Sequence, residues 1–410
     1  MKWTNKGHEL DELGAKYARV RNLYIWGACD DGKRCFDTLV WLNISSGFNI
    51  TFVDSSLLKR QDLCCGRAVI SPEEMLIALE LGEERGNSVV VICSATYRKE
   101  MLSAFEYGEN QENVFEWTYT SHAQKNNFIA HFLSIFMLYK YGILFWLQMN
   151  FISTYKCNLN CRSCLNFCDY IANKEAKDVT FEEFKQHIDD VFSKVDFIYS
   201  FHIAGGEPFL NKDLPMYLDY VANHYRSRIR KFFVVTNSTI TPPPRLLQAL
   251  KKADCFVQLD DYSETVPLCA ERLPIIKRLL DEHQIGYSVE TVPWWYDLQF
   301  ETTDNYSFDS RQLEEYRDSC NTLMHMYQYG RIYSCCFEIA TANARLIEID
   351  EMTDAFIEIA ESSKIEFLEY SLGFTNKGYT DFCKRCRGLG ANAVKIPVAE
   401  QVPKRKLPRR

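Results

Sequence analysis

Residues 155–164 read YKCNLNCRSC and place Cys157, Cys161 and Cys164 in the spacing C-x3-C-x2-C. Three thiolates on one short loop can hold three irons of a [4Fe–4S] cube and leave the fourth iron open to a ligand. The chain has 16 cysteines among 410 residues. At that frequency such a spacing arises by accident in roughly 2–3% of chains. The loop therefore predicts a catalytic cluster, but it needs support from the rest of the sequence.

Length, charge and hydropathy narrow the class of protein. A chain of 410 residues is too long to fold around one ordinary hydrophobic core, so we expect two or three domains. The net charge of −8 argues against a nucleic-acid partner. The polar stretch from Met1 to Asp11 shows no signal segment, which favours a cytoplasmic protein whose cysteines serve metal or redox chemistry. Polar residues interrupt the apolar stretch 128–151, so we expect a buried helix and a strand there and no membrane contact.

Residues 1–125 alternate apolar strands with helical segments, which predicts an α/β domain with a Rossmann-like parallel sheet. The turn at Gly27 resembles the dinucleotide-binding fingerprint, with Asp54 at the position of a ribose-binding acid. Cys29 replaces the middle glycine, which favours a packing role for this turn; NAD binding is the alternative. The domain also resembles the small N-terminal domain of sugar-modifying acyltransferases, through residues 26–28, 52–54 and 69–74.

A second series of strands and helices begins near residue 143. We expect strands at 143–153, 197–204, 231–237, 255–260 and 286–292, with helices at 180–194, 214–228, 243–253 and 267–284. This alternation predicts a partial (β/α)6 barrel over residues 126–305. Residues 306–392 form a cysteine-rich extension with a final helix near 351–363, and the Pro- and basic-rich residues 393–410 are expected to be a disordered tail.

The motif Gly205-Gly206-Glu207-Pro208 follows the next expected strand after the cysteine loop. With both motifs, the chain resembles the radical SAM superfamily. The resemblance implies that the three cysteines bind a catalytic [4Fe–4S] cluster whose open iron is chelated by S-adenosylmethionine. It also implies that the glycine motif binds the methionine amino group, because glycine carbonyls can approach closely and a carboxylate offsets an ammonium.

Two further strand ends match the superfamily. Asn237 lies in a turn that the resemblance places near the cofactor, and Asp260 lies where many members have an acid beside the ribose. Both residues fit the role of a strand-end cap equally well. The chain departs from the pattern at Gln258, where a serine is usual, and at Ser163, where many members have an aromatic residue that covers the adenine.

The C-terminal extension carries four more candidate ligands. Cys320, Gly330 and Cys335 follow the spacing C-x9-G-x4-C, and Cys383 and Cys386 form a C-x2-C pair. This arrangement resembles the auxiliary-cluster extension of SPASM/twitch enzymes and implies a second, fully ligated [4Fe–4S] cluster. A zinc site is the alternative that cysteine spacing alone leaves open. The adjacent residue, Cys336, could replace Cys335, although the glycine spacing favours Cys335.

The resemblance implies an oxidoreductase-type enzyme that cleaves S-adenosylmethionine to a 5′-deoxyadenosyl radical, which abstracts hydrogen from a substrate C–H bond. An auxiliary cluster favours oxidation. The resemblance to a twitch-type aminocyclitol dehydrogenase and to sugar-modifying acyltransferases implies the dehydrogenation, or another modification, of a sugar, cyclitol or sugar nucleotide. A reductase such as flavodoxin or ferredoxin would supply the electron. The alternatives are radical modification of a ribosomally made peptide and a non-catalytic iron–sulfur electron carrier. The histidines show no ligand spacing, and no catalytic residue is assigned.

Overall fold

The computed structural model describes residues 8–80, 86–105, 111–118, 126–171, 175–297, 305, 307–320, 325–347, 356–373, 377–387 and 393–403. The chain divides into two compact units that meet in sequence at residues 145 and 146. The first unit extends beyond the expected boundary at 125, because the helical residues 128–141 pack within it. Phe136 lies 4.8 Å from Phe48 between ring centroids, and the Tyr139 hydroxyl donates to Asp11 at 2.6 Å.

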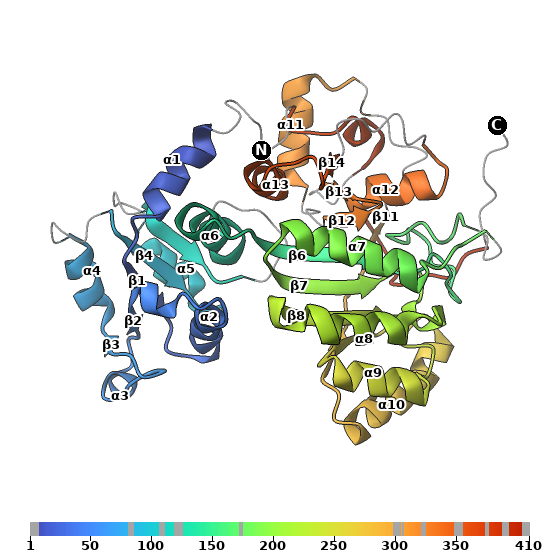
Figure 1. Ribbon diagram of the computed structural model, residues 1–410, viewed down its shortest axis with the longest axis horizontal. Coiled ribbons are helices and arrows are strands. Elements are labelled where there is room, and N and C mark those ends of the chain that lie inside the picture. The colour runs from blue at the N-terminus through green and yellow to red at the C-terminus, as the bar shows by residue number, and fades with distance from the viewer. Residues whose placement is uncertain are drawn as a thin grey trace. The chain divides into compact units, whose positions relative to one another are not determined.

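The first unit contains a five-stranded sheet in the order β3-β2-β1-β4-β5 (Figure 1). All of its strand pairs are parallel, as the alternation of strands and helices predicts. The strands are β1 Asn22–Trp26, β2 Asn49–Val53, β3 Val69–Ile70, β4 Ser88–Ile92 and β5 Val114–Glu116. The helices are α1 His8–Tyr17, α2 Asp30–Trp41, α3 Leu57–Arg60, α4 Pro72–Glu80, α5 Arg98–Ser103 and α6 Ser134–Tyr141, with a π-helix at Phe128–Leu133 and 3-10 turns at Ser45–Gly47 and Gln111–Asn113.

The turn after β1 is occupied by contacts within the protein. The carboxylate of Asp54 accepts hydrogen bonds from the backbone N–H of Ala28 and Ser56, both at 3.0 Å, and from Lys59 Nζ at 2.8 Å. The first turn of α2 carries two acidic residues, which oppose an anion at that helix N-terminus. These contacts favour the packing role of this turn over dinucleotide binding.

The second unit contains an eight-stranded sheet in the order β10-β9-β8-β7-β6-β12-β13-β14. The strands from the βα series are β6 Phe145–Ile152, β7 Phe197–Ala204, β8 Ile229–Thr236, β9 Phe256–Asp260 and β10 Tyr287–Glu290. They lie within two residues of the expected strands. The intervening helices are α7 Phe181–Lys194, α8 Leu214–His224, α9 Pro244–Lys252 and α10 Pro267–Glu282, with 3-10 turns at Pro208–Leu210 and Arg226–Arg228.

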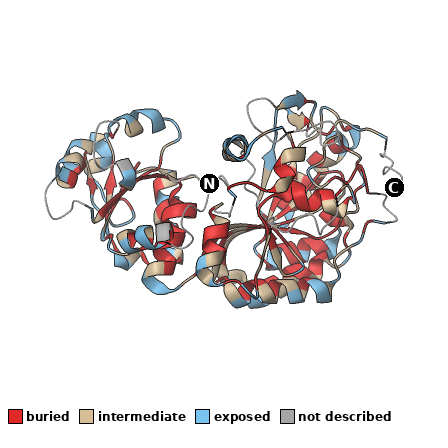
Figure 2. Cartoon of the chain, turned by 90° about the horizontal axis from the view of Figure 1, so that it is seen from above, coloured by how far each residue is buried: buried red, intermediate tan, exposed pale blue. Residues whose placement is uncertain are grey.

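Helix α7 illustrates why these segments form. Thr180 and Glu183 make a reciprocal capping box at its N-terminus, and the helix buries apolar residues at helical spacing. One of them, Phe184, stacks on Tyr217 of α8 with ring centroids 4.0 Å apart. In each unit, buried residues concentrate on the strands and on the inner faces of the helices (Figure 2).

The cysteine-rich extension continues the same sheet. Strand β12, Met326–Gln328, pairs parallel to β6, and β13, Arg331–Tyr333, and β14, Phe356–Glu358, follow in antiparallel pairs. The remaining elements are α11 Ser310–Ser319, α12 Cys336–Asn343, α13 Lys364–Ser371 and a 3-10 helix at Asp381–Arg385. A separate two-stranded sheet pairs β11, Trp295–Asp297, with β15, Val394–Ile396.

Two expectations for this region need correction. The final helix expected near 351–363 is wrong, because 356–358 form β14 and the helix begins after Ser363, whose capping box with Glu366 fixes its start; residues 351–355 lie outside the described residues. The tail expected to be disordered from 393 is ordered over 393–403, where β15 pairs with β11 and Gln401 bridges to Cys161. Residues 404–410 lie outside the described part of the chain.

Within the part of the chain that the structure describes, no helix combines the length and the apolar character needed to cross a membrane.

Candidate functional site

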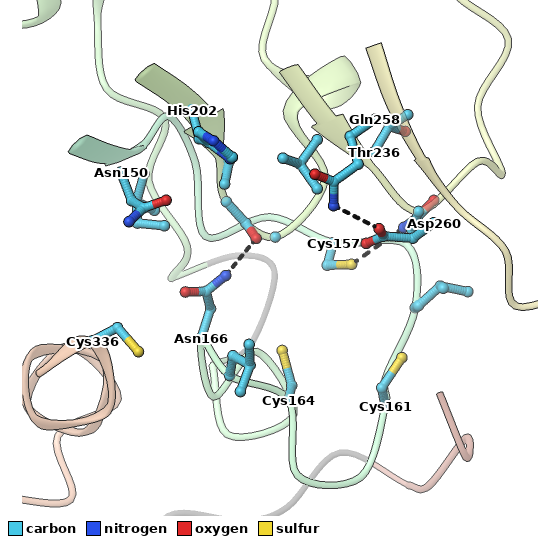
Figure 3. Close-up of a pocket in the computed structure, with 18 of the residues that line it drawn as sticks. Asn150, Cys157, Cys161, Cys164, Asn166, His202, Thr236, Gln258, Asp260 and Cys336 are labelled. Carbon is cyan, nitrogen blue, oxygen red and sulfur yellow. Dashed lines mark hydrogen bonds between the residues drawn. The ribbon is translucent and has the colours of Figure 1, made fainter. Parts of the chain in front are cut away.

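A cavity of about 360 Å³ lies at the carboxyl ends of strands β6 to β9 (Figure 3). The loop after β6 contributes all three cysteines of the C-x3-C-x2-C pattern to its wall. The carboxyl ends of β7, β8 and β9 contribute the other predicted cofactor residues that reach it. The predicted residues that line the cavity are Cys157, Cys161, Cys164, Gly205, Gly206, Asn237 and Asp260.

The two glycines fit where no other residue would. Gly205 has a φ of +157°, and a Cβ on it would lie 2.5 Å from the carbonyl oxygen of Thr154. A Cβ on Gly206 would lie 2.3 Å from the carbonyl oxygen of Lys156. The Gly206 N–H donates to that Thr154 oxygen at 2.7 Å. The glycine motif therefore packs directly against the cysteine loop, which explains why the two motifs share one cavity.

Glu207 and Pro208 do not line the cavity. Glu207 is fully buried, and its carboxylate accepts hydrogen bonds from Phe209 N at 3.0 Å, Thr236 Oγ1 at 2.8 Å and Asn237 N at 2.8 Å. We expected this carboxylate to face the methionine ammonium. In the structure it instead joins the ends of β7 and β8, so it positions Asn237.

Burial of Glu207 predicts a pH dependence of stability. Desolvation raises the pKa of its carboxyl to about 7 from 4.5. Between these values the folded protein binds more protons than the unfolded chain, so stability falls as the pH rises from 5 to 8. The expected share of Glu207 is about 3 kcal/mol. Burial raises the pKa of Asp260 to about 6, which acts in the same direction.

Urea unfolding at pH 5 and pH 8 measures this effect. Glu207→Gln should be less stable than the wild type overall and should show a weaker decline between the two pH values. Glu361→Gln, at an exposed position of the same unit, is the matched control and should keep the wild-type decline. Equal declines in all three proteins would contradict the role assigned to Glu207.

Each cysteine of the triad has a polar neighbour. Asn237 Nδ2 donates to Cys157 Sγ at 3.7 Å, and Gln401 Nε2 donates to Cys161 Sγ at 3.1 Å. A hydrogen bond from Cys168 lowers the pKa of the Cys164 thiol. Our sequence reasoning missed Gln401. It gave Cys168 no role, although the closeness of that residue to the triad in sequence was a usable signal.

The departures from the superfamily pattern have structural counterparts. Ser163 adopts a φ of 53°, and its hydroxyl donates to Asp297 Oδ1 at 3.0 Å. Aromatic residues reach the cavity from elsewhere: Tyr262 and Trp295 both line it, with ring centroids 5.5 Å apart in an edge-to-face pair. Asp260 accepts hydrogen bonds from Gln258 Nε2 at 3.1 Å and from Tyr262 Oη at 2.9 Å.

Apart from Asp260, the strand walls of the cavity carry uncharged hydrogen-bonding groups. Gln148 and Asn150 of β6, His202 of β7 and Gln258 of β9 line it, and no lysine or arginine does so among the described residues. Burial lowers the pKa of His202 to about 4, so its imidazole is neutral at pH 7. Ser200 Oγ lies 2.6 Å from His202 Nε2 and orients the ring.

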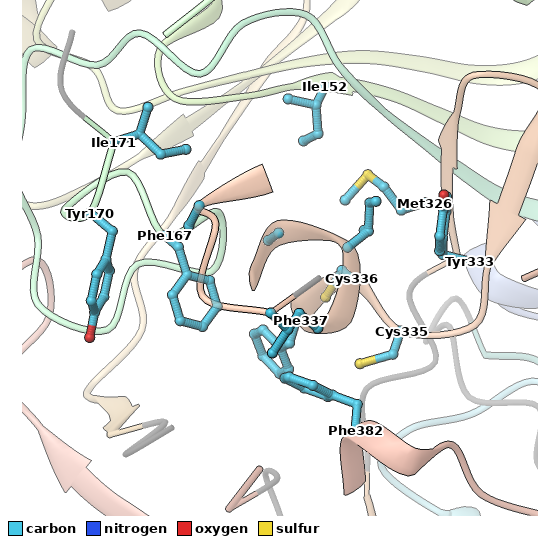
Figure 4. Close-up of a cluster of buried hydrophobic side chains, with 14 of the residues drawn as sticks. Ile152, Phe167, Tyr170, Ile171, Met326, Tyr333, Cys335, Cys336, Phe337 and Phe382 are labelled. Carbon is cyan, nitrogen blue, oxygen red and sulfur yellow. The ribbon is translucent and has the colours of Figure 1, made fainter. Parts of the chain in front are cut away.

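The four predicted auxiliary ligands lie in one region of the extension. Cys320 ends α11, Cys335 caps the start of α12, Cys383 lies in the last 3-10 helix, and Cys386 follows that helix directly. Cys335 and Cys386 share a buried cluster with Phe337 and Phe382 (Figure 4). Cys336 belongs to the same cluster and also lines the cavity of the triad, unlike Cys335.

Arg317 is a half-buried cation among these cysteines that sequence reasoning missed. Burial acts to lower the pKa of its guanidinium, but the negative charges of Cys335, Cys383, Cys320 and the buried Glu338 together raise it by more. One terminal nitrogen donates to the Ser334 carbonyl at 3.0 Å. A cation at this position suits an anionic group held by the four cysteines.

The cysteines are available as ligands for iron–sulfur clusters. All 16 cysteines are free of disulfides. Within the described ranges, no three His, Cys, Asp or Glu side chains gather closely enough for one metal ion. A cube presents its irons at separate corners, so its ligands need not converge on one point. The separation of the thiols in both cysteine sets is therefore compatible with a [4Fe–4S] cube.

Comparison with known proteins gives one family match. Residues 151–308 match the Radical SAM superfamily. No curated protein matches the chain. Among solved structures, "Native anSMEcpe with bound AdoMet and Cp18Cys peptide" is 14% identical with a TM-score of 0.37, and "Native anSMEcpe with bound AdoMet" is 13% identical with a TM-score of 0.37. Each match covers 56% of this chain and 81% of the other. The chain thus carries a Radical SAM superfamily domain at residues 151–308.

Proposed function

We propose that this protein is an enzyme that cleaves S-adenosylmethionine and removes a hydrogen atom from a C–H bond of a small hydroxylated molecule. The observation that carries the proposal is the single cavity shared by Cys157, Cys161, Cys164 and the Gly205-Gly206 turn. When bound, the two clusters and S-adenosylmethionine would supply the electron for cleavage, the abstracting 5′-deoxyadenosyl radical and an acceptor for an electron released in oxidation.

The residues of the chain supply positioning. Cys157, Cys161 and Cys164 would hold the catalytic cluster. The Gly205 carbonyl lies at the cavity and already accepts a hydrogen bond from Asn166 Nδ2 at 2.7 Å, so it can accept from the methionine amino group. Asp260 and Asn237 reach the cavity from the next strand ends.

The cavity walls support an uncharged, hydroxylated substrate such as a sugar or cyclitol. Gln148, His202 and Gln258 offer donors and acceptors without net charge. The phosphates of a sugar nucleotide would find no lysine or arginine on the described walls. The order β3-β2-β1-β4-β5 of the first sheet supports a Rossmann-like N-terminal domain, the feature on which the resemblance to sugar-modifying enzymes rests. The proposed reaction is therefore the dehydrogenation of an alcohol to a ketone.

Anaerobic reconstitution tests the function. The protein with iron, sulfide, a chemical reductant and S-adenosylmethionine should release 5′-deoxyadenosine, and a neutral polyol should stimulate the release more than its phosphate ester or a peptide does. Absence of 5′-deoxyadenosine would refute the enzyme proposal. Stimulation by peptides alone would transfer the proposal to peptide modification.

The same preparation tests the auxiliary cluster that we propose for Cys320, Cys335, Cys383 and Cys386. Two clusters require about eight irons per chain, and Cys383→Ala should lower the content to about four. If the wild-type protein instead contained about four irons and a zinc ion, the four cysteines would form a zinc site.

A further inference from the structure

The C-terminal segment 394–403, here called the strap, closes over the cysteine loop. Its strand β15 pairs with β11, and the Thr265 hydroxyl donates to the Val398 carbonyl at 2.6 Å. Arg162 of the cysteine loop forms ion pairs with Glu400 of the strap at 3.2 Å and with Asp297 of β11 at 2.6 Å. The strap is thus attached to the loop by its backbone and by charge.

The backbone contact sets Gln401 directly opposite Cys161. The Arg162 N–H donates to the Glu400 carbonyl at 2.7 Å, and the Val402 N–H donates to the Asn160 carbonyl at 2.9 Å. These bonds flank an antiparallel bridge between Cys161 and Gln401. In such a non-hydrogen-bonded pair the two side chains approach closely on one face of the ladder.

The partners of the Gln401 amide fix its orientation. Its Oε1 accepts from the Asn160 backbone N–H at 2.9 Å, so this atom must be the acceptor. Its Nε2 donates to the Ala399 carbonyl at 2.7 Å and to Cys161 Sγ at 3.1 Å. A flipped amide would oppose donor to donor at Asn160 and acceptor to acceptor at Ala399. The N–H that points at the sulfur is therefore held by two other bonds.

We propose that Gln401 is a positioning residue that raises the reduction potential of the cluster held through Cys161. The proposal rests on the function proposed above. A hydrogen bond to a cluster thiolate stabilises the reduced state more, because that state carries one more negative charge. Among the triad contacts described, the one from Gln401 is shorter than the 3.7 Å contact from Asn237 to Cys157. Through Gln401, the strap thereby affects how easily the cluster is reduced.

Two substitutions at Gln401 separate its hydrogen bond to the Cys161 sulfur from its attachment to the Asn160 backbone. Gln401→Leu removes the whole amide. Gln401→Glu keeps an oxygen that can accept from Asn160 N but replaces the donor with a charged acceptor. Lys395→Ala is the matched control on the strap, because Lys395 contacts the Trp294 ring and, among the contacts of the described residues, makes no bond to the cysteine loop. Gln401 and Lys395 are both exposed, so their replacement should leave the fold intact.

An EPR-monitored redox titration of the full-length reconstituted protein measures the effect. The cluster of the triad is identified as the signal that changes when S-adenosylmethionine is added. In Gln401→Leu the ratio of reduced to oxidised cluster at a fixed potential should fall about tenfold, which equals a midpoint about 59 mV lower for a one-electron couple. In Gln401→Glu this ratio should fall at least as far, and in Lys395→Ala it should match that of the wild type.

The outcomes distinguish this inference from the proposed function. A wild-type protein without a signal that responds to S-adenosylmethionine would refute the function itself. Normal signals with unchanged midpoints in both Gln401 variants would overturn the tuning role alone. Failure of both variants to assemble the cluster, while Lys395→Ala assembles it, would also overturn tuning and would assign Gln401 to holding the loop.

Discussion

Cys164→Ala is expected to reduce the release of 5′-deoxyadenosine to background, roughly a thousandfold or more below the wild type. The side chain of Cys164 lines the same cavity as Cys157 and Cys161, and the chain supplies no fourth cysteine to that loop except Cys168, which instead contacts Cys164. Two remaining thiolates cannot hold three irons of the cube. The loss should therefore affect assembly of the cluster and every later step.

The measurement combines product formation with iron content. Cys164→Ala should lose about four irons per chain and keep those of the auxiliary site. Cys255→Ala is the matched control, since Cys255 is a buried cysteine of the same unit outside the cavity, and it should keep both the iron and the activity. Full activity in Cys164→Ala would contradict the assignment of the triad. If the protein were an electron carrier, neither the wild type nor any of these variants would cleave S-adenosylmethionine.

The parts of the site that the sequence predicted are those carried by short contiguous motifs. The cysteine loop and the glycine turn each follow a strand, and the carboxyl ends of parallel strands meet at one edge of a sheet. That rule alone is enough to bring Cys157 and Gly206 together, and the structure places both at one cavity. Their roles as ligands stay predictions.

Side-chain direction was harder to predict than position. Glu207 lies where its motif implied, but three donors from Phe209, Thr236 and Asn237 turn its carboxylate into the protein. A buried carboxylate takes the nearest donors available, and two of these, Thr236 and Asn237, lie at the end of another strand. The sequence of the motif contains no information about these two donors.

The strap was missed because its contacts are far apart in sequence. Gln401 and Cys161 are 240 residues apart. The proline and basic residues around Gln401 are typical of disorder, since few of them can be buried. Order arises instead from backbone pairing with β11 and with the cysteine loop. Pairing of this kind depends on the partner strand more than on local composition.

Gly206→Ala is expected to lower 5′-deoxyadenosine formation by about a hundredfold while the auxiliary cluster stays intact. The added Cβ would lie 2.3 Å from the Lys156 carbonyl oxygen and 3.1 Å from the Cβ of Cys157. The first of these is a backbone atom, so the clash cannot be relieved by rotating a side chain. The loop must move, and Cys157 moves with it. Overpacking of this kind also costs about 1–3 kcal/mol of stability.

Gly142→Ala separates this effect from general destabilisation. Gly142 caps α6 with a φ of +68°, and a Cβ there would meet no atom within 4 Å. Its replacement should cost about 1 kcal/mol through backbone strain and leave cleavage unchanged. Urea unfolding and product formation, measured on both variants, then give a clear contrast: similar losses of stability but a loss of activity only in Gly206→Ala. Cleavage by Gly206→Ala within twofold of the wild type would show that the cysteine loop tolerates displacement, and the close packing of the two motifs would not be a requirement for catalysis.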